Sequence, residues 1–389
     1  MLLLLLACPP KKTPDSGGDT DALVDDTALV EGRWSGEAST EDAVEVRSGD
    51  LVDRALQTPA GLYLASPRFE TNTGQVCLDD ACWSGDAIGV SFGVSMAWVG
   101  ELAVSAHQAS PNGQWSGAVY LLESEVVLEG QEGDLAGIAL ASVGETLAIG
   151  GMGADTTEID GGIVYVLDDG ADDPDLIEGT YLFGTDPGGY FGIDVAWAEL
   201  DGDGAPDLLV GATGATGEMM GTGAAFAFQG PVEPWSRDLD ADFAVRGVVT
   251  DDDTGKTVEG IDHDGDGLDE WVIGSPGAER VDLVVGSEVV ATLQGDPDGR
   301  LGFSITTVDL DGDGLEDLVM GATRQGLGGE VLVAYGPFAG VVTPQLVIGA
   351  AGEGDKLGLT TGATDQGFWA GASRALDGEG AVYLFATGL

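Results

Sequence analysis

Three nine-residue segments of this chain carry acidic side chains at spacings that suit a metal ion. The carboxylates stand at positions 1, 3, 5 and 9, where they can converge on one hard cation if the chain curls tightly. The candidate ligands are Glu199, Asp201, Asp203 and Asp207, then Asp262, Asp264, Asp266 and Glu270, and finally Asp309, Asp311, Asp313 and Asp317. An all-oxygen set rich in carboxylates suits Ca²⁺ better than Zn²⁺ or copper. The sequence therefore predicts about three calcium sites.

Glycine and a backbone carbonyl complete the predicted loops. Position 6 is glycine in every copy (Gly204, Gly267, Gly314), and glycine takes a positive φ without a Cβ clash. The backbone carbonyl of position 7 would supply another oxygen, and the residues at that position are Ala205, Leu268 and Leu315.

An EF-hand is the obvious alternative, and position 12 argues against it. An EF-hand needs a bidentate Glu there and a helix on either side. This chain has Val210, Ile273 and Met320 instead, each inside a short apolar run typical of a strand. We therefore interpret the segments as loop-to-strand calcium sites. A plain acidic turn would explain one copy, but three matching copies favour the metal.

Composition limits the class of protein and its partners. The 389 residues include 68 acidic and 14 basic side chains, for a formal charge of −54. Such a surface repels phosphate backbones and anionic lipid headgroups, which argues against nucleic-acid binding. A hydrophobic fraction of 43% argues against a wholly disordered chain, and 65 Gly among short apolar runs indicate an all-β fold.

The N-terminal residues resemble the end of a bacterial lipoprotein signal peptide. Five consecutive Leu and an Ala precede Cys8, the candidate lipidation site, and this run is too short to span a bilayer. An ordinary frayed terminus with a chance Cys is the alternative. We expect a signal over residues 1–8, a flexible acidic tether over 9–31 and a folded body over 32–389. The protein would then be exported and held at the bacterial envelope or outer surface by its lipid alone.

The remaining cysteines, Cys77 and Cys82, end one strand and begin the return. A hairpin can bring them into bonding range, and a disulfide is plausible in an oxidising compartment. A zinc site would need more ligands. Two unpaired buried thiols remain the alternative.

The acidic loops belong to a longer repeat. Seven units recur at roughly 40–60 residues, the length of a four-stranded propeller blade. Most units open with an aromatic residue or Leu near a Gly, continue into an apolar run ending in a Gly-Ala-like turn, and close with a Gly before a β-branched or aromatic strand. The predicted fold is an all-β, seven-bladed β-propeller.

The repeat resembles the FG-GAP repeat of integrin α-subunit propellers, most closely at Gly189-Tyr-Phe-Gly192 and Gly274-Ser-Pro-Gly-Ala278. The likeness covers about nine-tenths of the chain, although unit five has Thr254-Gly255 in place of Phe-Gly. Units two, three and seven carry short turns in place of the acidic loop. The resemblance implies calcium in the first hairpin of the loop-bearing blades. It also implies a partner on the opposite face.

Few residues suit catalysis. His263, at position 2 of an acidic loop, is expected to be solvated, while His107 suits a turn or a partner contact. The chain lacks a Gly-x-Ser-x-Gly elbow, and its two unrelated His residues make a Ser-His-Asp triad improbable. We predict a non-catalytic adhesion-type module that binds a protein or a glycan. A polysaccharide lyase or hydrolase, and a purely structural envelope component, are the alternatives.

Candidate partner contacts are aromatic and Met residues on the predicted partner-facing loops. They are Trp115, Tyr181, Met219 and Met220. Packing between blades is the alternative role for each of them.

Overall fold

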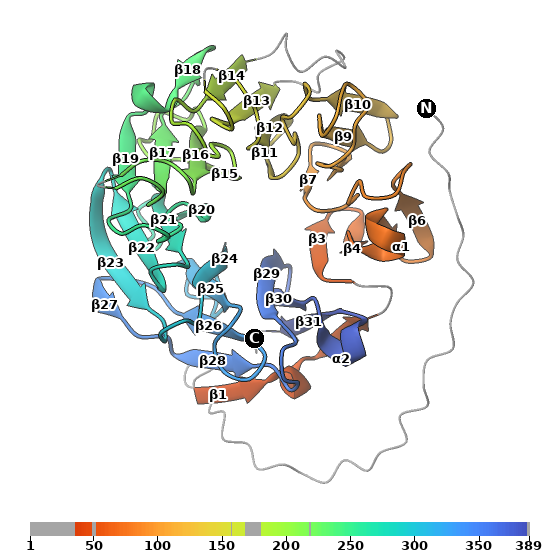
Figure 1. The fold of residues 1–389 in the computed structure, drawn as a ribbon. Helices are drawn as coiled ribbons and strands as arrows, with labels where there is room; N and C mark the ends of the chain where they lie inside the picture. Colours follow the sequence, from red (N-terminus) through yellow and green to blue (C-terminus); the bar gives the residue numbers. More distant parts are fainter. Residues whose placement is uncertain (1–35, 49–51, 157, 168–179, 218, 387–389) are drawn as a thin grey trace.

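The computed structural model describes residues 36–48, 52–156, 158–167, 180–217 and 219–386 (Figure 1). The expected signal, Cys8 and the tether lie outside these residues. Within the described ranges, no helix is long and apolar enough to cross a membrane.

Seven β-sheets surround a central opening, so the predicted seven-bladed propeller is confirmed (Figure 1). Each blade has four antiparallel strands, and three blades add a fifth strand in parallel. The blades with four strands are β3 (Arg54–Thr58), β4 (Gly61–Ser66), β5 (Gln75–Leu78) and β6 (Ala81–Ser84); β7 (Met96–Trp98), β8 (Leu102–Ser105), β9 (Ala118–Leu121) and β10 (Val126–Glu129); β15 (Asp194–Ala198), β16 (Asp207–Ala212), β17 (Ala224–Phe228) and β19 (Phe243–Arg246); and β29 (Leu357–Thr364), β30 (Gly367–Ala372), β31 (Ala381–Ala386) and β2 (Glu45–Ser48).

The third, fifth and sixth blades carry the extra strands. They consist of β11 (Leu140–Val143), β12 (Thr146–Gly151), β13 (Ile163–Leu167), β14 (Thr180–Phe183) and β18 (Ser236–Arg237); β20 (Thr257–Ile261), β21 (Glu270–Ser275), β22 (Arg280–Val285), β23 (Glu288–Gln294) and β27 (Gly340–Val342); and β24 (Leu301–Val308), β25 (Asp317–Ala322), β26 (Glu330–Ala334), β28 (Leu346–Gly349) and β1 (Gly36–Ser39). Short helical turns complete the fold: α1 (Phe69–Asn72), α2 (Ala375–Gly378), η1 (Thr40–Asp42) and η3 (Asp238–Asp240).

The N-terminal strands close the ring. β2 pairs antiparallel with β31 and becomes the outer strand of the last blade, while β1 pairs parallel with β28 of the sixth blade. The N-terminal segment thus contributes strands to two adjacent blades, and the last of these also contains β31, the last strand of the chain. Strands β18 and β27 also join neighbours, because each lies in the loop after the third strand of one blade and pairs with the outer strand of the blade before it.

Glycine allows the blades to approach each other. A Cβ on the glycine of a second strand would lie 1.9–2.3 Å from the carbonyl oxygen of the Phe-Gly-like glycine in the next blade, at Gly150, Gly211, Gly274 and Gly321. A real Cβ cannot lie that close to a backbone oxygen. The repeat therefore has glycine in its Gly-Ala turns and Phe-Gly openings because the backbones of neighbouring blades are in contact there.

The hydrophobic core lies between the sheets. Phe191, for example, is buried and packs against Phe226 and Phe228, with ring centroids 5.8 and 6.2 Å apart. The second and third strands of most blades are buried on both faces, which explains their continuous apolar runs.

Candidate calcium sites

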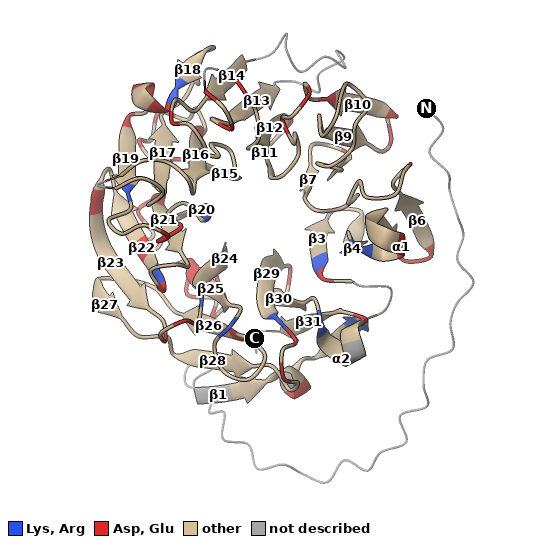
Figure 2. Cartoon of the chain, viewed as in Figure 1, with Lys and Arg blue, Asp and Glu red and all other residues tan. Residues whose placement is uncertain are grey.

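The three acidic loops are the hairpins that join the first and second strands of blades four, five and six. They connect β15 to β16, β20 to β21 and β24 to β25. Position 12 of each loop lies within the second strand, so each loop leads into a strand and not into the helix of an EF-hand. Acidic residues occur on the loops around much of the ring, and basic residues are few (Figure 2).

Three carboxylates converge in each loop. The structure brings one oxygen of each member within 4.8 Å of the others in the sets Glu199, Asp201 and Asp203; Asp262, Asp264 and Asp266; and Asp309, Asp311 and Asp317. The carboxylates at positions 1 and 3 are common to all three sets. The third member is position 5 in the first two loops and position 9 in the last.

The backbone of each loop holds its carboxylates in place. In the third loop, Gly312 and Gly314 both donate their N–H to Asp309, at 2.7 and 3.0 Å, and Leu315 donates to Asp313 at 2.9 Å. The glycines at position 6 have φ of +84° to +88°, and a Cβ there would meet nothing within 4 Å. Glycine is thus required for the backbone conformation and not for space. The predicted role of the position 7 carbonyls stays a prediction.

Asp at position 9 fastens the loop to the body of the blade. Asp317 is fully buried and accepts hydrogen bonds from the N–H of Leu310 at 2.9 Å and of Gly336 at 2.8 Å. Asp207 accepts equivalent bonds from Leu200 and Gly230. Burial, followed by the charges of nearby loop carboxylates, raises the pKa of Asp317 to about 7 against the two hydrogen bonds.

The second loop differs, because position 9 is Glu270. Its buried Oε2 has no hydrogen-bond partner, and burial raises the pKa of Glu270 to about 7, with a further rise from Asp264 and Asp266. The Nε2 of His263 lies 3.5 Å from this oxygen. Since Nδ1 of His263 accepts the N–H of Phe338 at 3.1 Å, the neutral ring carries its proton on Nε2 and turns that proton toward Glu270.

The expectation that His263 is a solvated residue is wrong. Its ring is only 8% exposed and lies 5.7 Å from the ring of Phe338. Position 2 points into the body of the protein, as Leu310 also does in the third loop. A polar residue in a loop was expected to face solvent. Here the backbone N–H of Phe338, far away in the sequence, donates to the His263 ring and takes the place of water.

The donor set fits a hard divalent cation. Every side-chain donor at positions 1, 3 and 5 is a carboxylate oxygen, and an oxygen of Glu270 lies within 4.8 Å of ligand atoms of Asp264 and His263. Carboxylates held this close repel each other, and calcium would neutralise that repulsion.

A further pair of acidic residues links consecutive loops. At position 8, Asp269 accepts the N–H of Glu199 at 2.8 Å and returns its own N–H to the carbonyl of Glu199 at 2.7 Å. Glu316 forms the same reciprocal pair with Asp262, at 3.2 and 3.1 Å. The first loop has Pro206 at position 8, and the blade before it carries no acidic loop. Sequence reasoning missed this link, although the acid at position 8 in the second and third loops was its signal.

We expect Asp269→Ala to weaken calcium binding by the first loop, of which Asp269 is not a ligand. The Glu199 amide would lose a charged acceptor, which costs about 1.5 kcal/mol or roughly tenfold in affinity. Calcium titration in a background carrying Asp264→Ala and Asp311→Ala isolates the first loop. Asp201→Ala in that background is the control that removes a ligand directly. An unchanged affinity in Asp269→Ala would contradict the link.

We also expect the calcium-free protein to lose stability as the pH rises. The pKa of Glu270 and of Asp317 is raised to about 7, so the folded chain holds these protons more tightly than the unfolded chain. The free energy of unfolding should therefore fall between about pH 4 and pH 7, by on the order of 2 kcal/mol for each group. Thermal melts of chelated protein across this range measure the slope. Asp317→Asn should reduce it, and equal slopes in both proteins would count against the assignment.

The other candidate residues have varied surroundings. A disulfide joins Cys77 to Cys82 across the β5–β6 hairpin. Trp115, Met219 and Met220 are exposed on loops between second and third strands. Tyr181 instead lies in β14, where its ring packs 4.2 Å from that of Trp235. His107 is buried, which does not suit the expected partner contact.

Comparison with known proteins agrees with the architecture. By its fold the protein is a seven-bladed β-propeller. The family model of the FG-GAP repeat matches residues 301–342, which contain β24, the third acidic loop, β25, β26 and β27. The chain is thus a propeller that carries the FG-GAP repeat. Among curated proteins, none matches it in sequence.

Proposed function

We propose that this protein is a calcium-stabilised, non-catalytic binding module that holds a protein or glycan partner on the face opposite the acidic loops. One observation carries the proposal. In five blades, the loop between the second and third strands exposes a large apolar side chain. These residues are Trp115, Ile159, Met220, Leu327 and Leu376.

The strand order places these side chains on one face. Because successive strands of a blade are antiparallel, the loop between strands one and two and the loop between strands two and three project from opposite faces. Blades are arranged alike around the ring, so the apolar loop tips share one face and the acidic loops share the other. Exposed apolar residues grouped on a surface rimmed by polar groups are typical of an interaction site.

A division of labour follows from this arrangement. The acidic loops serve to stiffen three consecutive blades, and the apolar loop tips serve to bind. Catalysis is assigned to neither face, since the carboxylates at positions 1, 3 and 5 are ligands in this proposal and a metal-bound carboxylate is a poor general acid.

Capture from a surface extract with the immobilised full chain tests the binding role. A variant with Trp115→Ser and Met220→Ser should lose the captured protein or glycan. Trp235→Ser is the matched control, because Trp235 is 65% exposed but lies in the loop after a third strand, away from the apolar tips. Capture that is equal in all three proteins would refute this use of the face.

We also propose export and lipid anchoring through Cys8. Leu-Leu-Ala before Cys8 supports the proposal. Expression of Cys8→Ala in a bacterial host should move the protein from the membrane fraction to the soluble fraction. Unchanged fractionation would contradict the anchor.

A further inference from the structure

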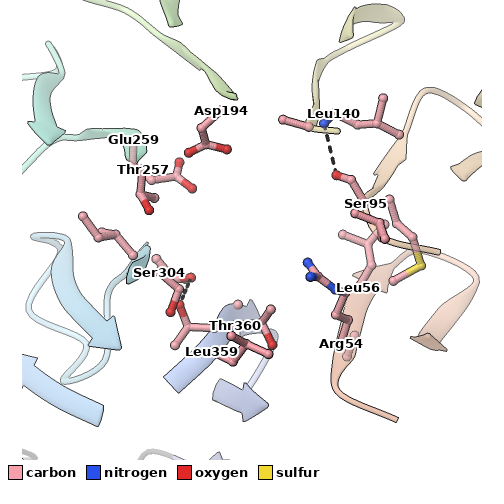
Figure 3. Close-up of a pocket in the computed structure, with 18 of the residues that line it drawn as sticks. Arg54, Leu56, Ser95, Leu140, Asp194, Thr257, Glu259, Ser304, Leu359 and Thr360 are labelled. Atoms are coloured by element: carbon pink, nitrogen blue, oxygen red, sulfur yellow. Dashed lines mark hydrogen bonds between the residues drawn. The ribbon is translucent and has the colours of Figure 1, made fainter. Parts of the chain in front are cut away.

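The innermost strands of the seven blades line a cavity of about 560 Å³ that is open to solvent (Figure 3). This volume is within the range of sites for small organic molecules. Its wall combines apolar side chains, such as Leu56, Leu359 and Phe303, with hydroxyls such as those of Ser304 and Thr360. An alkyl chain and polar groups can both find contacts there.

Four charged residues line this cavity: Arg54, Asp194, Lys256 and Glu259. Two of the chain's 14 basic residues therefore face one small space, and blue segments border the central opening at β3 and β20 in Figure 2. In Figure 3, the guanidinium of Arg54 and the carboxylates of Asp194 and Glu259 point into the opening from opposite sides.

Asp194 and Lys256 already have contacts within the wall. Asp194 accepts the N–H of Val258 at 2.9 Å, which joins the fourth blade to the fifth. The Nζ of Lys256 lies over the ring of Phe303, 5.4 Å from its centroid. Burial raises the pKa of Asp194 to about 6 and lowers the pKa of Lys256, and the charge of each residue opposes the shift of the other. Asp194 and Lys256 thus each have a partner within the wall.

Arg54 shares its acidic partner with a second arginine, and Glu259 has no basic partner among the described residues. The Nε of Arg54 forms an ion pair with Oδ1 of buried Asp53 at 3.6 Å but makes no hydrogen bond. The other oxygen of Asp53 accepts a hydrogen bond from Arg68 at 2.7 Å, so one carboxylate serves two guanidinium groups. Among the described residues, the carboxylate of Glu259 has no hydrogen bond or ion pair. Burial raises the pKa of Glu259 well above its ordinary value, and the charges of Asp194 and Glu316 raise it further. Glu259 therefore favours its neutral form in the empty cavity, and a cationic group beside it would favour the carboxylate.

We propose that the central cavity binds a small zwitterion, with its carboxylate on Arg54 and its ammonium on Glu259. A simple anion would compensate Arg54 alone, and a simple cation would compensate Glu259 alone. A molecule with both charges, separated by methylene groups, meets both residues and lays its alkyl part against the apolar wall. None of the residues that line this cavity is a candidate calcium ligand or one of the exposed apolar loop residues.

Calorimetric titration of the calcium-loaded full chain tests the proposal with three ω-amino acids of increasing length: glycine, γ-aminobutyrate and ε-aminocaproate. One of the longer two should bind best, because only a separated pair of charges reaches both walls. Butyrate and butylamine are the single-charge probes and should bind at least about tenfold more weakly, since each forfeits one charge-assisted contact.

Arg54→Gln and Glu259→Gln should each lower the affinity for the best zwitterion by about tenfold or more. Arg47→Gln, on the exposed strand β2, is the control and should bind as the unsubstituted chain does. Far-ultraviolet circular dichroism checks folding, and Arg54→Lys and Glu259→Asp serve as second variants if a glutamine variant does not fold. The proposal would be overturned if none of the three zwitterions gave binding heat. It would also be overturned if the Arg54 and Glu259 variants bound the best zwitterion as tightly as the unsubstituted chain does.

Discussion

Removing calcium is expected to lower the melting temperature of this protein by on the order of 15 °C. An ion that binds only the folded state stabilises it by about 2.7 kcal/mol at a hundredfold excess over its dissociation constant, so three sites contribute about 8 kcal/mol. In a domain larger than 250 residues, each kcal/mol corresponds to about 2 °C. Without the ion, three closely spaced carboxylates in each of three loops repel each other.

The measurement is a thermal melt of the full chain with chelator, with calcium, and with calcium added back after chelation. Add-back should restore the higher transition. Magnesium at the same concentration is the control and should restore less, because it gives up its bound waters reluctantly. Identical melting temperatures with chelator and with calcium would show that calcium does not stabilise the protein.

Substituting Gly321 by valine is expected to destabilise the protein by on the order of 4 kcal/mol. A Cβ at this position would lie 1.9 Å from the carbonyl oxygen of Gly358 in the next blade and 2.5 Å from Oγ of Ser304. The obstacle is the backbone of a neighbouring sheet, which cannot rotate away as a side chain can. The blades would have to separate, and the buried contacts of both sheets would weaken.

Gly144→Ala is the matched control, since Gly144 has a φ of +59° and a Cβ there meets nothing within 4 Å. It should cost only the strain of a left-handed residue, about 1–2 kcal/mol. Denaturant unfolding of both variants in calcium separates the two effects. A loss in Gly321→Val no larger than in Gly144→Ala would show that the blades tolerate separation at this point.

The propeller and its acidic loops could be predicted because their chemistry is local. A Gly at position 6 and carboxylates two residues apart determine a loop within nine residues, and three copies reveal the pattern. The glycines that touch the next blade also recur at fixed places in each repeat, which gives the blade count.

Other features depend on residues far apart in the sequence and could not be predicted. His263 is buried by Phe338, and Asp269 holds the amide of Glu199. Similarly, β18 and β27 pair with blades formed earlier in the chain. Arg54 and Glu259 meet in one cavity only because the ring closes. Each of these contacts joins separate blades, and even where a repeat carries a signal, as with the acid at position 8, the signal does not name the partner.

The central claim is that the three loops hold calcium, and a count of bound ions tests it most directly. Native mass spectrometry of the full chain, exchanged into dilute calcium, should show three ions per chain. Asp311→Ala should show two, because it removes a carboxylate from the third loop alone. A chain that carries no calcium under these conditions, or an Asp311→Ala variant that still carries three, would contradict the account.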